Sequence, residues 1–251
     1  MTEAWAWERA EKELFRSITR ITAASKQLAA ADNVPVQKSD EAHVGPLASD
    51  GNVKTATPMK ASAKPFYLGS ELAKVRLVIF NDYECPYCQR IERDVRALLK
   101  QHPDLISVTY KHFPLCVDCN SDRKTNTHPN ACRAASAVEA AGALKGQAGY
   151  WRMHEWMFDH KGKFTLDELT EALPALGYDD PAAFLAVMQD SETSRKILLD
   201  VVEAGSLKID ATPAIFVNGE QLNGFEAENA LVRAVMAAAG EVADRGQKTG
   251  P

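Results

Sequence analysis

The motif CPYC at residues 85–88 limits what this chain can fold into more than any other feature of its sequence. Before it, residues 75–80 (VRLVIF) are a short apolar run rich in β-branched side chains, which predicts a buried strand. After it, residues 87–100 carry apolar side chains at helical spacing. Pro86 suits the first turn of a helix, because its missing N–H would have no partner there. The sequence therefore places two cysteines at a strand-to-helix junction.

This position favours thiol chemistry. The unpaired N–H groups and the dipole at a helix start stabilise an anion, so a thiol there loses its proton more readily. The thiolate is the reactive species in disulfide exchange. We expect Cys85, the more exposed of the pair, to be the nucleophile, and Cys88, one turn away, to resolve the mixed disulfide. Half of a zinc site and inert thiols are the alternatives for a bare C-x-x-C pair.

The remaining pattern predicts an α/β domain that contains a helical insertion. Residues 106–112 alternate apolar and polar side chains, which predicts a second strand parallel to the first. Residues 214–217 (AIFV), followed by an Asn-Gly turn, predict a hairpin. Between them, residues 128–208 show only helical patterns, and residues 226–239 predict a closing helix. The helices expected within the insertion are residues 131–144, 150–158, 166–176, 181–188 and 194–207.

The two ends of the chain have a different character. Residues 1–30 predict an amphipathic helix with an apolar side chain at every seventh position. This helix is expected either to pack on its own domain or fray in solution, or to serve oligomerisation or anchoring; its short heptad run is weak support for a coiled coil. Residues 31–65 predict a flexible linker, since they are polar, contain four prolines and lack an apolar period. Residues 243–251 predict a polar tail.

Charge and hydropathy exclude several classes of protein. The chain has 29 Lys and Arg against 34 Asp and Glu, and this net charge of -5 gives no broad basic face for nucleic acid. A run of about 18 apolar residues, which a transmembrane helix needs, does not occur. Charged residues between Glu3 and Arg16 interrupt the apolar core that a secretory signal requires. We expect either a cytoplasmic protein or one whose export signal or membrane anchor has been lost.

A second candidate element is the pair Thr212-Pro213, directly before residues 214–217. Proline at the entrance to a buried strand is unusual, because it cannot donate a hydrogen bond to the ladder. A cis bond before Pro213 would explain its presence, and it would turn the backbone groups of Thr212 outward to pair with a substrate strand.

Four separated motifs resemble the thioredoxin-fold disulfide oxidoreductases of the DsbA (disulfide-bond protein A) type. In chain order they are IFNDYECPYC, HPNACRAA, YWRMHEWMF and ATPAIFVNG. The resemblance covers roughly residues 66–240. It implies a thioredoxin-like core formed by residues 66–127 and 209–242, with residues 128–208 as a helical insertion.

The resemblance also implies roles for single residues. Cys85 matches the nucleophile, Cys88 the resolving cysteine, and Pro213 the cis-proline. The Pro-Tyr pair between the cysteines is similar to that of glutaredoxins and of some DsbA-like proteins. The candidate substrate-binding residues are Pro86, Tyr87, Thr212 and Pro213.

Other polar residues near the motif are expected to be unremarkable in function. Many relatives carry a buried acid six residues before the nucleophile, but this chain has Ile79 there, which speaks against a proton relay through that position. Asp82 and Glu84 are expected to be solvated. His154 and the aromatic and methionine side chains of residues 150–158 are expected to pack in the core.

Three further cysteines leave alternatives open. Cys116, Cys119, His128 and Cys132 have the spacing C-x2-C-x8-H-x3-C, a permissible structural zinc set. Cysteine spacing also allows a disulfide or free thiols. The stretch is similar to thioredoxin-like modules found with vitamin K epoxide reductase-type proteins, and this resemblance implies a Cys119–Cys132 disulfide with Cys116 as an extra thiol.

Together these features predict a thiol–disulfide oxidoreductase that acts on protein substrates, as an oxidant, without a metal or organic cofactor. The resemblance implies a quinone-linked membrane partner that reoxidises the protein. Disulfide formation requires an oxidising compartment, so we expect an extracytoplasmic location. An isomerase or reductase on the same scaffold is the first alternative. A zinc-stabilised binding or chaperone module is the second.

Overall fold

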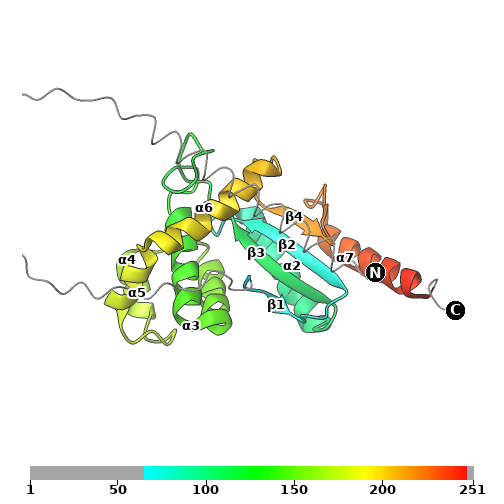
Figure 1. Cartoon of the computed structure of the whole chain (residues 1–251), viewed down its shortest axis with the longest axis horizontal. Coiled ribbons are helices and arrows are strands. Elements are labelled where there is room, and N and C mark those ends of the chain that lie inside the picture. The colour runs from blue at the N-terminus through cyan, green and yellow to red at the C-terminus, as the bar shows by residue number, and fades with distance from the viewer. Residues whose placement is uncertain (1–64, 248–251) are drawn as a thin grey trace, which may run out of the picture. The chain divides into compact units, whose positions relative to one another are not determined.

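The structure is a computed structural model that describes residues 65–247 (Figure 1). The helix predicted for residues 1–30, and residues 31–64 of the predicted linker, lie outside the described residues. The strands are β1 (Leu68–Gly69), β2 (Val75–Asn81), β3 (Ile106–His112), β4 (Ala214–Val217) and β5 (Glu220–Gln221). The helices are α2 (Pro86–Gln101), α3 (Ala131–Asp159), α4 (Leu166–Ala172), α5 (Pro181–Met188), α6 (Ser191–Ser206) and α7 (Ala230–Gln247).

The five strands form one mixed sheet in the order β1-β3-β2-β4-β5. β2 and β3 are parallel, in register from Val75 beside Ile106 to Asn81 beside His112. β4 is antiparallel to β2, and the outer strands β1 and β5 are antiparallel to their neighbours. The sheet therefore brings the end of β2, where the CPYC motif begins, beside the start of β4, where Pro213 stands.

The two faces of β2 are buried against different helices. Leu77 and Ile79 belong to the main core, which also contains Ile91 and Val95 of α2 and Leu231 of α7. Phe80 points to the other face, where a smaller cluster includes Val201 and Ala204 of α6. Alternating side chains of a strand point to opposite faces, and both faces are covered here, so β2 reads as a nearly continuous apolar run.

The helices α3 to α6 lie between β3 and β4 in the chain and gather beside the sheet (Figure 1). Ion pairs attach them to the end of β3. The imidazole Nε2 of His112 lies 3.1 Å from Glu139 of α3, and Lys196 of α6 lies 2.9 Å from the same carboxylate. Lys111 lies 2.5 Å from Glu203 of α6.

Some boundaries differ from those that the sequence predicts. The two helices expected at 131–144 and 150–158 are joined in α3 across a kink, where Gly146 has a positive φ of 61°. β1 was not expected, because a strand of two residues is too short to show an apolar period.

The last helix is shifted relative to the prediction. α7 starts at Ala230, after a turn in which Asn229 has a φ of 56°, and it continues to Gln247, through part of the predicted tail. Polar side chains do not end a helix by themselves, since many have high helix propensity.

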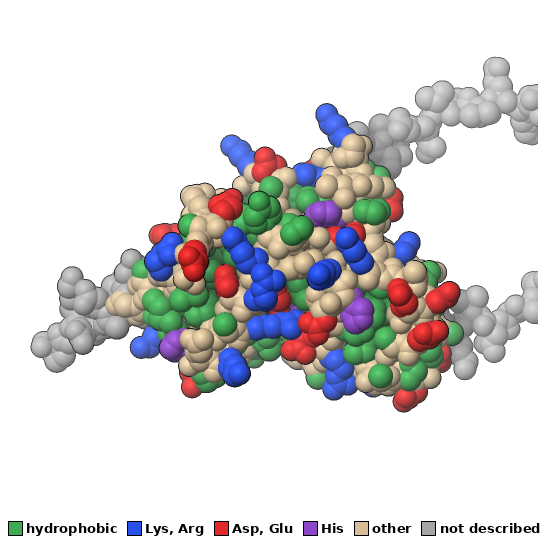
Figure 2. Space-filling model, turned by 180° about the vertical axis from the view of Figure 1, so that it is seen from behind, with side chains coloured by type: hydrophobic (Ala, Val, Ile, Leu, Met, Phe, Trp, Pro, Cys, Tyr) green, Lys and Arg blue, Asp and Glu red, His purple; other side chains and the backbone are tan. Residues whose placement is uncertain are grey.

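On the face drawn in Figure 2, acidic and basic side chains are interspersed, and hydrophobic side chains lie between them. Within the described part of the chain, none of the helices combines the length and the apolar character needed to cross a bilayer.

Candidate active site

The CPYC motif stands where β2 gives way to α2. Cys85 is the residue that precedes the helix, with extended backbone angles (φ -70°, ψ 121°), and Pro86 follows in the first helical turn. The main-chain N–H of Cys85 donates to the main-chain oxygen of Asp82 at 3.1 Å, which closes the turn between strand and helix. The thiol of Cys85 is therefore held at the positive end of the α2 dipole.

Both cysteines of the motif are free thiols in this structure and both are buried, Cys85 with 4% exposure and Cys88 with 2%. A hydrogen bond from the Cys88 thiol is the main cause that lowers the pKa of Cys85 from 9.0 to about 6; Thr212 and the main-chain N–H groups of Cys88 and Tyr87 add to it, against the effect of burial. Burial first, and then the nearby Cys85 sulfur, raise the pKa of Cys88 well above 9.0. At neutral pH the negative charge therefore resides on Cys85.

Thr212 and Pro213 lie against this sulfur. The Thr212–Pro213 peptide bond is cis, and the Cys85 thiol donates to the main-chain oxygen of Thr212 at 3.3 Å. The hydroxyl of Thr212 is buried and has no hydrogen-bond partner in the structure, yet it favours the ionised form of Cys85. It is thus a donor available to the thiolate.

Two residues of the motif face solvent. Pro86 is exposed, and Tyr87 has 53% exposure. The ring of Tyr87 meets that of Phe225 edge-on, with centroids 6.1 Å apart, and the guanidinium of Arg90 lies 5.8 Å from the Tyr87 ring centroid. Tyr87 therefore forms part of the rim around Cys85.

The expectation that Asp82 and Glu84 are solvated is wrong. Asp82 has 2% exposure and Glu84 has 9%. The carboxylate of Asp82 accepts hydrogen bonds from the main-chain N–H of Glu84 at 2.8 Å and of Leu115 at 2.7 Å, and the Nδ1 atom of His128 lies 2.9 Å from it. Their burial was not visible in the sequence, because the loop that covers Asp82 follows β3, more than 30 residues later.

The loop after β3 is closed by a disulfide between Cys119 and Cys132, with an S–S distance of 2.06 Å. Cys116 is a free, buried thiol packed against this disulfide. His128 contacts Asp82 instead of a cysteine, so the four groups of the possible zinc set do not converge. In residues 65–247, no three His, Cys, Asp or Glu side chains form a group that could hold a metal ion.

A family model described as Thioredoxin matches residues 61–237, which is most of the described chain. The chain belongs to the thioredoxin family. The predicted fold, a thioredoxin-like core with inserted helices, is confirmed, and the predicted resemblance to the DsbA type is confirmed for the fold.

Solved structures of thioredoxin-like proteins share this fold. BdbD from Bacillus subtilis, in its oxidised form, is 18% identical with a TM-score of 0.58, over 70% of this chain and 93% of that chain. A periplasmic thioredoxin-like protein from Salmonella enterica serovar Typhimurium is 21% identical with a TM-score of 0.56, over 70% and 90%. DsbA2 from Pseudomonas aeruginosa is 22% identical with a TM-score of 0.53, over 70% and 95%. At these identities the likeness shows the fold alone.

Curated relatives are more similar in sequence but much longer. The Na(+)/H(+) antiporter NhaA 1 of Salinispora arenicola is 34% identical over 170 residues, which are 68% of this chain and 24% of the antiporter. NhaA 3 of Salinispora tropica is 31% identical over 191 residues, which are 76% of this chain and 27% of that protein. The chain spans about a quarter of the length of these relatives.

The residue six positions before Cys85 is apolar, as the sequence shows. Ile79 has 1% exposure and packs in the main core. An acid is buried nearby in a different place: Glu92 of α2, one turn after Cys88 and on the same helix face.

We call Glu92 and its partners the Glu92 cluster: Glu92, Arg96, Tyr110, His154 and Tyr83. The carboxylate of Glu92 accepts from Arg96 Nε at 2.7 Å and from the Tyr110 hydroxyl, and His154 Nε2 lies 3.4 Å away. The Tyr83 hydroxyl lies 2.9 Å from His154 Nδ1. Burial alone would raise the pKa of Glu92, but His154, Tyr110 and Arg96 together lower it. His154 is packed, as expected, but this cluster was not predicted, since Glu92 reads as a surface residue of an amphipathic helix.

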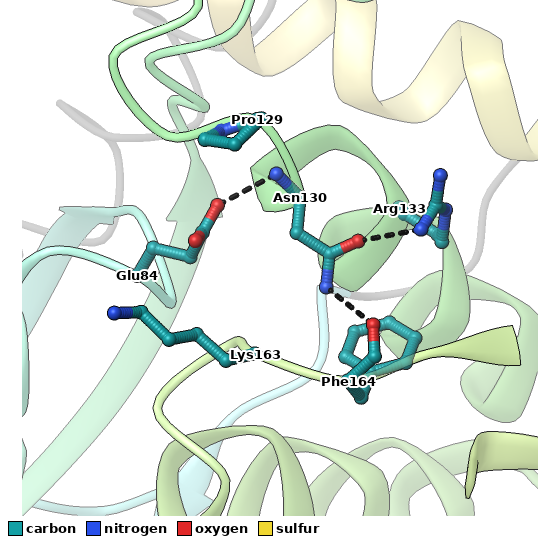
Figure 3. Close-up of a pocket in the computed structure, with 6 residues that line it drawn as sticks. All are labelled: Glu84, Pro129, Asn130, Arg133, Lys163 and Phe164. Atoms are coloured by element: carbon teal, nitrogen blue, oxygen red, sulfur yellow. Dashed lines mark hydrogen bonds between the residues drawn. The ribbon is translucent and has the colours of Figure 1, made fainter.

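A shallow pocket lies beside the residue that precedes Cys85 (Figure 3). Asn130 is central to it: its main-chain N–H donates to the Glu84 carboxylate at 2.7 Å, and its side-chain oxygen accepts from Arg133 at 2.9 Å. Gly162 packs so closely on the turn that a Cβ atom there would lie 2.8 Å from the main-chain nitrogen of Glu84. The turn before Cys85 is thus held by the inserted helices as well as by the sheet.

Proposed function

We propose that this protein is a thiol–disulfide oxidoreductase that exchanges disulfides with protein substrates through Cys85 and Cys88. The observation that carries the proposal is the asymmetry of the two thiols at the start of α2, where the pKa of Cys85 is lowered to about 6 and that of Cys88 is raised. A thiolate beside a protonated resolving thiol is the arrangement that disulfide exchange requires.

We propose that the protein acts as an oxidant. A client thiolate attacks Cys85 in the oxidised pair, the Cys85–Cys88 bond breaks, and Cys88 leaves and takes up a proton. A second client thiolate then attacks the client sulfur of the mixed disulfide; a client disulfide forms and Cys85 leaves as a thiolate. The low pKa of Cys85 supports this direction, because a stabilised leaving thiolate also stabilises the reduced form.

We propose that the client binds along Thr212 and Pro213, next to the exposed rim formed by Pro86 and Tyr87. The main-chain oxygen of Thr212 already lies against the reactive sulfur, so a client strand beside β4 would bring its own sulfur to Cys85. We assign no metal or organic cofactor to the reaction, since the sulfur atoms carry the electrons.

We also propose an extracytoplasmic location and a quinone-linked membrane partner that restores the Cys85–Cys88 disulfide. The Cys119–Cys132 disulfide supports an oxidising compartment. One solved structure of the same fold is described as periplasmic. The N-terminal segment at residues 1–30 is the candidate for oligomerisation.

Trapping of mixed disulfides tests the proposal. The Cys88→Ser variant is expected to accumulate covalent complexes with client proteins, because Cys85 still attacks client disulfides but Cys88 is no longer there to displace the client. Cys85→Ser, which keeps Cys88, is expected to form none. A Cys85→Ser protein that exchanges disulfides at the wild-type rate would contradict the assignment. The reduction potential gives the direction: about -120 mV fits a strong oxidant and about -270 mV a reductase.

A further inference from the structure

Asp82 and His128 form a fixed pair next to the reactive thiol. The Asp82 side chain has no exposed surface, and Nδ1 of His128 lies 2.9 Å from its Oδ2 atom. The same carboxylate also accepts hydrogen bonds from the main-chain N–H groups of Glu84 and Leu115. His128 is held in turn by a hydrogen bond from its own N–H to the Leu115 oxygen at 3.1 Å. The imidazole therefore has one defined position, while its 17% side-chain exposure lets it exchange protons with water.

The pair lies beside the turn that carries Cys85, because the main-chain oxygen of Asp82 accepts from the main-chain N–H of Cys85 at 3.1 Å and the Asp82 carboxylate contacts His128. The titratable groups that act on His128 are Asp82, Glu84 and Cys85, all three in the segment between β2 and the start of α2. The hydrogen bond to Asp82 is the main cause that raises the pKa of His128 above 6.5, and the charges of Cys85 and Glu84 add to it, while burial opposes it. Of these neighbours, only Cys85 gains and loses its charge when the disulfide is broken and formed.

The motif itself offers no positive side chain to the thiolate. Pro86 and Tyr87 are uncharged, and Gln89 completes the first turn of α2. The loop closed by the Cys119–Cys132 disulfide supplies the imidazole of His128 to Asp82, three residues before Cys85.

We propose that Asp82 and His128 are a redox-linked proton site, in which His128 binds a proton when the Cys85–Cys88 disulfide is reduced and releases it when the disulfide forms again. This inference rests on the proposed function, since it concerns the same pair of cysteines. In the exchange, two client thiols supply two electrons and two protons and become a disulfide. The Cys85–Cys88 bond breaks, one proton goes to Cys88, and the other goes to His128 while Cys85 remains a thiolate. Asp82 is the positioning residue that holds the imidazole.

The direct test is an NMR titration of the His128 imidazole in the full-length protein, reduced and oxidised. We expect the pKa of His128 to be higher in the reduced protein, because the Cys85 thiolate favours the imidazolium. His102, which follows the far end of α2, is the internal control, because Cys85 precedes the opposite end of that helix. An identical His128 pKa in the two states would overturn the proposal.

A variant gives a second, independent measurement. In reduced His128→Gln protein, the thiolate absorbance of Cys85 is expected to titrate at a higher pH than in the wild type, whose pKa is about 6; His102→Gln is expected to leave it unchanged. An unchanged Cys85 titration in folded His128→Gln protein would also overturn the proposal. If the wild-type protein fails to exchange disulfides at all, the proposed function is wrong. If it exchanges them but the pKa of His128 is the same in the reduced and oxidised protein, only this inference is wrong.

Discussion

The sulfur of Cys85 lies 3.3 Å from the main-chain oxygen of Thr212, although 127 positions separate the two residues. The antiparallel pairing of β2 with β4 creates this contact, since it places the residue before Pro213 next to the first residue of the CPYC motif. The reactive thiol, the neighbouring hydroxyl and the edge along which a client strand would bind therefore meet at one point.

Thr212→Val is expected to lower the reactivity of Cys85 with little change in the stability of the fold. The Thr212 hydroxyl is buried without a partner, so its loss should change the free energy of unfolding by less than about 1 kcal/mol. The thiolate loses a donor, so the pKa of Cys85 should rise and alkylation at pH 7 should slow.

Thr193→Val is the matched control, because the Thr193 hydroxyl donates to the Val187 oxygen at 2.7 Å, far from the CPYC motif in sequence. It should destabilise the protein by about 1 kcal/mol and leave Cys85 unaffected. Urea unfolding and alkylation kinetics measure both effects. A Thr212→Val protein that is strongly destabilised but equally reactive would refute the role of the hydroxyl.

Glu92→Gln is expected to destabilise the protein by about 2 kcal/mol at pH 7, because it weakens charge-assisted hydrogen bonds in the buried Glu92 cluster. The effect should depend on pH. The folded-state pKa of Glu92 is lower than its unfolded value, so its stabilisation is complete above about pH 4.5 and is lost as the pH falls through the folded pKa.

Urea unfolding of wild type and Glu92→Gln at pH 7 and at pH 3 checks this expectation. The difference between the two proteins should shrink at the lower pH. Glu155→Gln, at an exposed position of α3, should behave as wild type at both. If the two proteins differ in unfolding free energy by the same amount at pH 7 and at pH 3, the charge of Glu92 does not contribute to stability.

Replacing both Cys119 and Cys132 by Ala is expected to lower the free energy of unfolding by about 3 kcal/mol, the usual effect of a disulfide that closes a loop of this length. The double variant avoids leaving a new free thiol. Because the loop carries His128, the variant should also raise the pKa of Cys85.

Cys116→Ala is the control, since it removes a buried thiol but keeps the disulfide. It should lower the free energy of unfolding less than the double variant does, and it should leave the pKa of Cys85 unchanged. Thermal unfolding with and without reductant distinguishes the cases: reductant should destabilise the wild type and Cys116→Ala by breaking the Cys119–Cys132 bond, whereas in the double variant it can act only through the Cys85–Cys88 pair. Equal stability of wild type and double variant would contradict the prediction.

Local sequence signals predicted the elements that position the site. β-branched residues in β2, helical spacing in α2 and the Asn-Gly turn after β4 each report their own backbone conformation, so their positions agree with the structure within a few residues. The 106–112 strand is reproduced with the same bounds.

Contacts between distant segments could not be predicted in this way. Asp82 is buried because Leu115 and His128 fold over it, and Glu92 is buried because β3 and α3 bring Tyr110 and His154 to it. In the sequence each acid looks like a solvated residue, because its partners lie between 18 and 62 positions away. Only the tertiary structure shows that these charges are paired.

The central claim is that Cys85 is the thiol ionised at neutral pH. Its most direct test is the rate of alkylation of Cys85 and Cys88 in the fully reduced protein as a function of pH, with each site quantified by peptide mass spectrometry. The account predicts that Cys85 reacts with a midpoint at about pH 6 and that Cys88 reacts only above pH 9. A Cys85 midpoint near 9, or faster reaction at Cys88, would contradict it.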